Sequence, residues 1–347
     1  MADYFDYLNR FGNVTFAQQS LSIVDAAIFA QLAYCDFGTR TYGRLGDLTK
    51  ADATPMVAKT WQAANNLKLL TTLAHTPRYQ NVYWLAAVND FDFQRQQQFS
   101  AVTFQLTPNT YYLSFRGTRA NFVDWKEDFN LTFLDAIPSQ LAASNYLAEI
   151  ADYYPGNYYL GGHSKGGNLA TFAFAHAGDL RSTIQMVYNL DGPGLKRPMP
   201  SDPKILKLVP QSSLIGIILD PSQDFAVVHS TASGFNQHDL FSWEIRQRDF
   251  VYLPALDLRS RYAQKLLNQW VADLDDATKQ QALDAAYQVV QNTGQETFAD
   301  LAKQPATSAK AILSGLKATD HQAFKAAAHG LAQALLESVP KPDHHKS

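Results

Sequence analysis

The ten residues YYLGGHSKGG, numbered 158–167, combine a short aromatic run with a serine that has glycine two positions away on each side. The aromatic run has the composition of a β-strand, and residues 168–177 that follow have a helical pattern. A Gly-x-Ser-x-Gly sequence between a strand and a helix is typical of a sharp turn, because glycine leaves room where the chain reverses. The stretch therefore predicts that Ser164 is a nucleophile exposed at the edge of a sheet.

A serine hydroxyl is a weak nucleophile at neutral pH, so it needs a base and hydrogen-bond donors for the oxyanion that it creates. The residue after the nucleophile, Lys165, is predicted to supply its backbone N–H as one of these donors. A glycine-rich turn could instead cradle a phosphate. This one lacks the Gly-x-x-x-x-Gly-Lys-Ser/Thr and Gly-x-Gly-x-x-Gly spacings of such loops, which favours the nucleophile.

Strands and helices alternate around this turn. Periodicity predicts helices over 21–34, 55–73 and 140–153 and strands over 82–88, 99–106, 111–115, 158–160, 186–190 and 205–209. Two hairpins are expected, one joining 99–106 to 111–115 and one joining 214–219 to 225–229. The alternation predicts an α/β fold with a mostly parallel central sheet flanked by helices.

The composition changes near residue 257, where alanine, glutamine, leucine, lysine and aspartate become frequent in a helical pattern. We therefore expect one α/β domain over residues 1–256, with a helical segment at its N-terminus. A helical C-terminal appendage is expected over 257–340 and a disordered tail over 341–347. The N-terminal segment or the appendage would be placed to form a lid over a substrate cleft.

Composition limits the class of protein. The chain has 347 residues, 46% of them hydrophobic, and a formal net charge of -3, with no basic run that would suit nucleic acid. A single cysteine, Cys35, excludes an intramolecular disulfide and suits the cytoplasm, and the acidic, aromatic N-terminus does not resemble a signal peptide. No apolar run reaches 18 residues, so membrane contact would be confined to the surface. No metal-ligand spacing is present, and no metal or organic cofactor is expected.

Further motifs carry a family resemblance. With the serine turn, the segments Phe115–Thr118, Asp124–Trp125 and Asp128 resemble the landmarks of class 3 lipases, over roughly residues 25–250. Together with residues 191–194 (DGPG) and 237–239 (QHD), they more closely resemble a largely uncharacterised bacterial lipase-like family. The resemblance implies an α/β-hydrolase core and hydrolysis of carboxylic esters of small molecules or lipids.

A catalytic triad also needs a carboxylate that orients the histidine. Asp191 follows the first strand after the nucleophile helix, so its side chain would emerge at the same sheet edge as Ser164. Asp220 and Asp224 are the alternatives, although Asp220 precedes a proline and suits a turn. By the lipase resemblance the acid would follow the strand over 205–209, where this chain has Gln-Ser-Ser instead. We select Asp191.

The base and the second oxyanion donor are also chosen by position. His238 lies in a polar loop after the last core strands, whereas His229 lies within a strand pattern and is the second choice. His163 is expected to orient the turn. Thr118, in the loop after the strand over 111–115, is the candidate for the second oxyanion donor. Arg116 is expected to support that loop.

These residues predict a serine hydrolase that cleaves carboxylic esters through an acyl-enzyme. Two alternatives remain open at this point. The same site could transfer its acyl group to an alcohol or amine, or the fold could be a non-catalytic binding scaffold.

Overall fold

The computed structural model describes residues 2–38, 40–92, 97–118, 130–131, 134–220, 224–258, 260–261 and 264. Nearly all of the predicted C-terminal appendage, and the whole predicted tail, lie outside these residues. No helix in this part of the chain is both long and apolar enough to cross a bilayer.

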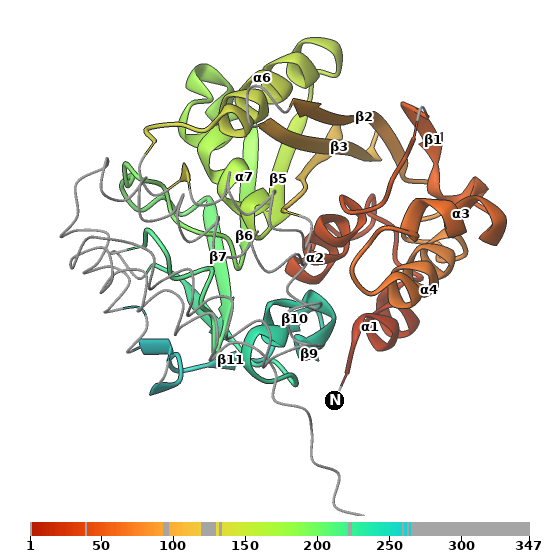
Figure 1. The fold of residues 1–347 in the computed structure, drawn as a ribbon. Helices are drawn as coiled ribbons and strands as arrows, with labels where there is room; N and C mark the ends of the chain where they lie inside the picture. Colours follow the sequence, from red (N-terminus) through yellow and green to blue (C-terminus); the bar gives the residue numbers. More distant parts are fainter. Residues whose placement is uncertain are drawn as a thin grey trace, which may run out of the picture.

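The centre of the fold is a mixed β-sheet, labelled in Figure 1. Among the described residues it has nine strands in the order β1(Tyr42–Arg44), β2(Tyr83–Asp92), β3(Gln97–Thr107), β4(Thr110–Phe115), β5(Asn157–His163), β6(Ile184–Leu190), β7(Ile205–Pro210), β8(Ala226–Val228) and β11(Tyr252–Leu253). The five strands from β4 to β8 run parallel, and the flanking pairs are antiparallel. A separate ribbon joins β9(Ile245–Arg246) to β10(Asp249–Phe250).

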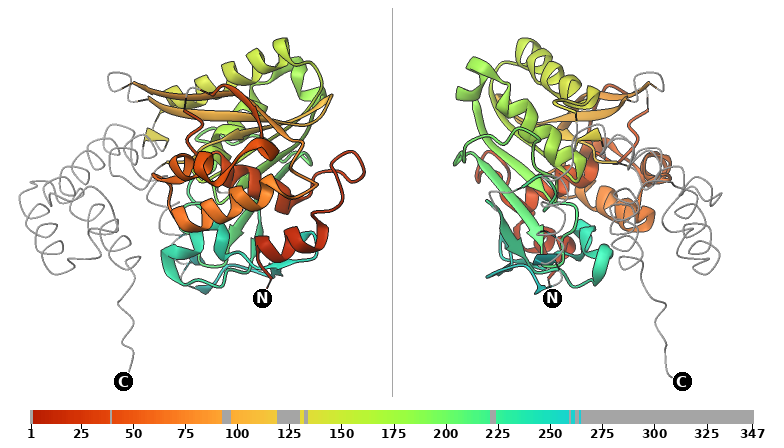
Figure 2. Two further views of the ribbon diagram at one scale, coloured as in Figure 1. Left: turned by 90° about the vertical axis from the view of Figure 1, so that its right-hand side faces the viewer. Right: turned by 60° about the vertical axis from the view of Figure 1, so that its left-hand side comes forward.

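Helices cover both faces of this sheet. The elements are α1(Tyr4–Phe11), α2(Ile23–Leu32), α3(Lys50–Val57), α4(Ala63–Ala74), α6(Pro138–Tyr153) and α7(Lys165–Ala175), with short 3₁₀ turns η1(Leu45–Asp47), η2(Gly178–Ser182), η3(Gly234–His238) and η4(Leu240–Ser242). One core packs α2 against the sheet through Phe29, Phe104 and Tyr112, and the other packs α6 and α7 on the opposite face. Figure 2 shows α6 and the N-terminal helices on opposite sides of the strands.

Helix α2 is buried on every side because nearly all of its ten residues are apolar. Ser22 caps its start by accepting a hydrogen bond from the backbone N–H of Asp25, whose carboxylate accepts one from Ser22 N in return. A helix fixed in this way carries the residues after it, including Tyr34, to the end of β5.

The fold class expected from the sequence is confirmed: this is an α/β-hydrolase fold with a parallel central sheet between helical layers. The predicted helices over 21–34 and 140–153 and the predicted strands of the core are present. The helix expected over 55–73 is divided into α3 and α4, because the chain turns between them and Gln62 has a left-handed φ of 58°.

The second predicted hairpin is wrong. Residues 214–219 form turns instead of a strand, and β8 pairs in parallel with β7. The backbone groups of this segment have other partners: Ile218 O accepts from Gly194 N at 2.8 Å, and Gly216 N donates to Asp191 Oδ1 at 3.1 Å. The segment therefore packs over the end of β6.

Candidate active site

Ser164 is the single residue between the end of β5 and the start of α7. Its φ of 58° and ψ of -134° are rare for a residue with a side chain and are typical of strained functional turns. Its backbone N–H donates to Leu190 O at the end of β6, at 2.9 Å. The strand–turn–helix arrangement therefore holds Ser164 beside the next strand of the sheet.

Glycine is required on both sides of this turn. A Cβ on Gly162 or on Gly166 would overlap the carbonyl oxygen of Phe115, the last residue of β4. These close approaches let β4, β5 and α7 converge on Ser164.

Asp191 and His238 meet at the same edge of the sheet. Asp191 directly follows β6, is 1% exposed and has a left-handed φ of 51°. Its Oδ2 atom accepts a hydrogen bond from Nδ1 of His238, the last residue of η3, at 2.6 Å. Because Nδ1 is used in this bond, Nε2 is the ring nitrogen left for proton transfer. The structure thus joins two of the predicted site residues from positions 47 apart in the chain.

The alternative site residues have partners elsewhere. Asp220 Oδ2 pairs with Lys207 Nζ at 2.6 Å, and both side chains are less than a tenth exposed. Burial lowers the pKa of Lys207, while the carboxylates of Asp220 and Asp191 act in the opposite direction. Asp224 accepts from Ser201 Oγ at 2.5 Å, and His229 Nδ1 lies 2.5 Å from Glu244 Oε2. The hydrogen bond to His238 Nδ1 comes from Asp191.

His163 uses both ring nitrogens in hydrogen bonds. Nδ1 lies 2.9 Å from the Tyr34 hydroxyl and Nε2 lies 2.7 Å from the carbonyl oxygen of His238. A carbonyl only accepts, so we assign the proton to Nε2, and the Tyr34 hydroxyl donates to Nδ1. Burial lowers the pKa of His163 well below 6.5, and the charge of His238 acts in the same direction. His163 is therefore a neutral ring that holds the backbone of His238 next to the turn at Ser164.

The segment expected to supply the second oxyanion donor lies against Ser164. A Cβ on Gly117 would overlap the Tyr34 hydroxyl and would lie 3.0 Å from Ser164 Cβ, so Thr118 is one residue beyond a close contact with Ser164. Arg116 Nη2 donates to Asn89 Oδ1 on β2 at 3.1 Å, and its support of the loop stays a prediction. Asp124, Trp125 and Asp128 lie outside the described residues.

Lys165 begins α7, where backbone N–H groups at the start of a helix have no acceptor within the helix. Its side chain is almost completely buried, and Nζ donates to Gln98 O on β3 at 3.2 Å. The side chain of Lys165 is thus used in packing across the sheet, and the role of its backbone N–H stays a prediction.

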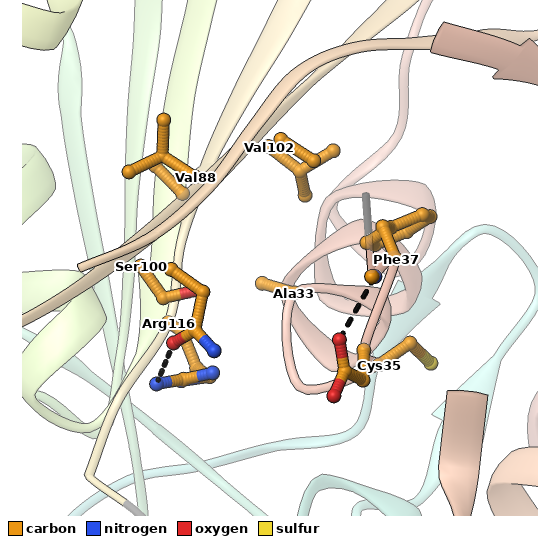
Figure 3. A pocket seen from close by; sticks show the side chains of 12 residues that line it. Ala33, Cys35, Phe37, Val88, Ser100, Val102 and Arg116 are labelled. Carbon is orange, nitrogen blue, oxygen red and sulfur yellow. Dashed lines mark hydrogen bonds between the residues drawn. The ribbon is translucent and has the colours of Figure 1, made fainter. Parts of the chain in front are cut away.

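A small cavity lies beside the Arg116 end of β4 (Figure 3). Figure 3 shows Arg116 and Ser100 on one side of it and Phe37 on the other. Its volume of about 20 Å³ is enough for a single water molecule, and too small for an ester substrate. Cys35 also lines it, and burial raises the pKa of that thiol to about 12, so the thiol is unreactive at neutral pH.

Sequence patterns did not single out Tyr34, Ser213 or Gly216 as neighbours of the site. Ser213 Oγ donates to Asp191 Oδ1 at 2.5 Å, although it comes from the turn after β7. A general rule could have pointed to Ser213 and Gly216, because residues that follow parallel strands gather at one edge of a sheet.

No group of three or more histidine, cysteine or acidic side chains that could hold a metal occurs in the described ranges.

Comparison with solved structures finds lipases at low identity. The Lip2 lipase from Yarrowia lipolytica is 15% identical, with a TM-score of 0.35 over 62% of this chain and 80% of its own. A structure described as a fungal lipase is 12% identical, with a TM-score of 0.41 over 75% and 93% of the two chains. Lipase II from Rhizopus niveus is 14% identical, with a TM-score of 0.35 over 60% and 80%. At these TM-scores the similarity to lipases carries no conclusion about the activity of this chain.

No curated protein matches this chain. The model of the Mbeg1-like family matches residues 73–288, which contain Ser164, Asp191 and His238 and make up more than half of the sequence. The chain therefore belongs to the Mbeg1-like family.

Proposed function

We propose that this protein is a serine hydrolase that cleaves carboxylic esters of small molecules or lipids through an acyl-enzyme. The observation that carries the proposal is the 2.6 Å hydrogen bond between His238 Nδ1 and Asp191 Oδ2, one strand away from the strained turn of Ser164. A buried carboxylate bound to Nδ1 of a partly exposed histidine is the arrangement that activates a serine hydroxyl.

In the proposed reaction, Ser164 Oγ attacks the ester carbonyl while His238 Nε2 takes the hydroxyl proton. Asp191 holds the imidazole in the required tautomer and stabilises its charged form. The backbone N–H groups of Lys165 and Thr118 donate to the oxyanion of the tetrahedral intermediate. His238 then returns the proton to the leaving alcohol, and the acyl group remains on Ser164.

In the second half of the reaction, His238 takes a proton from water, and the resulting nucleophile attacks the acyl-enzyme. Collapse of the second tetrahedral intermediate releases the carboxylic acid and returns the proton to Ser164. No metal or organic cofactor is required by these steps. The single cysteine suits a cytoplasmic location, and contact with lipid would occur at a membrane surface.

The test is labelling of the purified full-length protein with a fluorophosphonate probe, together with hydrolysis of p-nitrophenyl esters from short to long acyl chains. Ser164→Ala is expected to abolish both labelling and turnover. Ser114→Ala is the matched control, because Ser114 is also a buried serine but donates to Phe29 O at 2.9 Å on the α2 side of β4. This control is expected to keep both signals.

The outcomes separate the three classes of function. A wild-type protein that is neither labelled nor active would contradict the hydrolase and favour a binding scaffold. Turnover of the p-nitrophenyl esters that yields more ester of an added alcohol than free acid would favour an acyltransferase. A preference for long acyl chains would place the enzyme among lipases, and a preference for short chains among esterases.

A further inference from the structure

The carboxylate of Asp191 is held by a turn that follows a different strand. Asp191 comes directly after β6, while the residues that contact its Oδ1 atom, Ser213 and Gly216, follow β7. We refer to residues 213–216 as the 213–216 cradle. Because β6 and β7 are parallel neighbours, both ends reach the same edge of the sheet.

The two carboxylate oxygens of Asp191 have different partners. Oδ1 accepts from Ser213 Oγ at 2.5 Å and from Gly216 N at 3.1 Å, whereas Oδ2 accepts from His238 Nδ1 at 2.6 Å. The backbone of Asp191 has a left-handed φ of 51°, a conformation that surrounding contacts must maintain in a residue with a side chain. The contacts at Oδ1 therefore fix the direction in which Oδ2 points.

The cradle is itself well anchored. Ser213 is 2% exposed, its N–H donates to Pro210 O at 3.0 Å, and its carbonyl oxygen accepts from Ser260 Oγ at 2.8 Å. Gly216 N also lies 3.1 Å from Ser213 Oγ, which links the two ends of the cradle. These bonds fix the backbone of Ser213 so that its Oγ atom points to Asp191.

Position 216 has no room for a side chain. A Cβ there would overlap Asp191 Oδ1 and would lie 2.5 Å from Val209 Cγ1. The Gly216 backbone therefore lies close to the Asp191 carboxylate whether or not the Ser213 hydroxyl is present.

We propose that Ser213 is a positioning residue of the reaction: its hydroxyl, with Gly216 N–H, holds Asp191 Oδ1 so that Oδ2 binds His238 Nδ1 and directs Nε2 to Ser164. This inference rests on the proposed ester hydrolysis. Asp191 also interacts electrostatically with Lys207, which is paired with Asp220 in the interior. The hydroxyl of Ser213 is therefore the group whose removal acts most directly on Asp191.

The variant that tests this is Ser213→Ala. With the hydrogen bond to the charged carboxylate removed, kcat is expected to fall about 10-fold to 100-fold with KM unchanged, which corresponds to about 1.4 to 2.7 kcal/mol. Without the Ser213 donor, the Asp191 carboxylate can turn away and its contact with protonated His238 weakens, so the acid limb of the kcat/KM profile is expected to move to lower pH. Ser213→Thr keeps the hydroxyl and is expected to restore both values, and Ser114→Ala is the matched control.

A second readout does not depend on turnover. The proton on His238 Nδ1, bound to a carboxylate, gives a strongly deshielded resonance in proton NMR of the full chain, assigned by its loss in His238→Gln. We expect this resonance in wild type and Ser213→Thr, and expect it to broaden or shift upfield in Ser213→Ala. Gly216→Ala is expected to displace Asp191 in the same way while Ser213 is intact, and circular dichroism identifies any variant that does not fold.

The outcomes distinguish this inference from the proposed function. An active wild type with Ser213→Ala unchanged in kcat, pH profile and the Nδ1 resonance would overturn the role of Ser213 and leave ester hydrolysis standing. An inactive wild type whose Nδ1 resonance still depends on Ser213 would overturn ester hydrolysis and support the positioning of Asp191.

Discussion

Asp25 and Asp191 are the two most deeply buried carboxylates among the described residues, and they differ in what binds them. Asp25, at the start of α2, accepts from Arg78 through Nε at 3.0 Å and Nη2 at 2.7 Å, and from the hydroxyls of Tyr7 and Tyr79 at 2.8 and 2.5 Å. Asp191 accepts from one hydroxyl, one backbone N–H and the ring of His238.

The partners of Asp25 do not change their state at neutral pH. Arginine is always protonated, and burial raises the pKa of Tyr79 well above its usual value, so the tyrosine remains a donor. Arg78 also donates to the carbonyl oxygens of Val14, Gln19 and Ser20, which ties the N-terminal segment to the core. Asp25 is therefore part of a closed structural network.

The partner of Asp191 can exchange a proton and reaches solvent. The side chain of His238 is 18% exposed, compared with 1% for that of Arg78. Burial of a carboxylate is thus the same in both places, and the identity and exposure of its partner distinguish a structural network from a candidate catalytic one. Three experiments test this distinction.

The largest effect is expected for Asp191→Asn. The amide can donate to Nδ1 of His238 and favour the wrong tautomer, so kcat for ester hydrolysis is expected to fall about 10⁴-fold while the free energy of unfolding changes little by comparison. Ester hydrolysis and urea denaturation measure the two quantities. Asp220→Asn is the control for the alternative acid: if it abolished turnover in folded protein while Asp191→Asn did not, the assignment would be reversed.

Asp25→Asn is expected to act on stability alone. It removes the charge that compensates buried Arg78, which costs about 3 to 5 kcal/mol of unfolding free energy. Urea denaturation checks this, and kcat per folded molecule is expected to stay at the wild-type value. Asp52→Asn is the matched control because its pair with Arg40 is exposed to solvent, which screens the charges, so a much smaller loss is expected. Equal losses in both variants would contradict the network.

The smallest effect concerns His163 and pH. Its pKa is depressed in the folded state by burial, so the unfolded chain takes up this proton first as pH falls below about 6.5. The contribution of His163 to the free energy of unfolding is therefore complete above that pH. Below it, this contribution falls by up to about 1.4 kcal/mol per pH unit. The pH dependence of urea denaturation in wild type, His163→Gln and the exposed-site control His75→Gln measures this. A His163→Gln slope equal to that of wild type would show that His163 binds its proton in the folded state.

Much of the fold was predictable because its signals are local. Apolar periodicity located α2, α6 and the core strands, and the glycine pattern located the turn at Ser164. The turns over 214–219 were not predictable from their apolar composition, which resembles that of a strand. Their conformation depends on bonds to Asp191 and Gly194, which are remote in sequence.

The candidate site was predictable to the extent that parallel strand ends meet at one edge. That rule brings Asp191 near Ser164 but does not say which histidine lies beside them. The position of His238 depends on a loop that is held by His163 and by the Trp243 indole, which donates to Gln237 O at 2.8 Å. The cradle at Ser213 and Gly216 depends on backbone positions that no residue pattern specifies.

The parallel order of β4 to β8 has a consequence for the folding of this protein. Parallel neighbours are joined through long crossovers, so their pairings have high contact order and form slowly, after local hairpins such as β3–β4. Ser164 and Asp191 lie at the ends of the neighbouring strands β5 and β6, and His238 lies beyond β8, so the three residues meet after several parallel pairings have formed. Recovery of their mutual geometry during refolding would therefore report the completed assembly of the central sheet. A partly folded chain with native-like hairpins would not yet show this geometry.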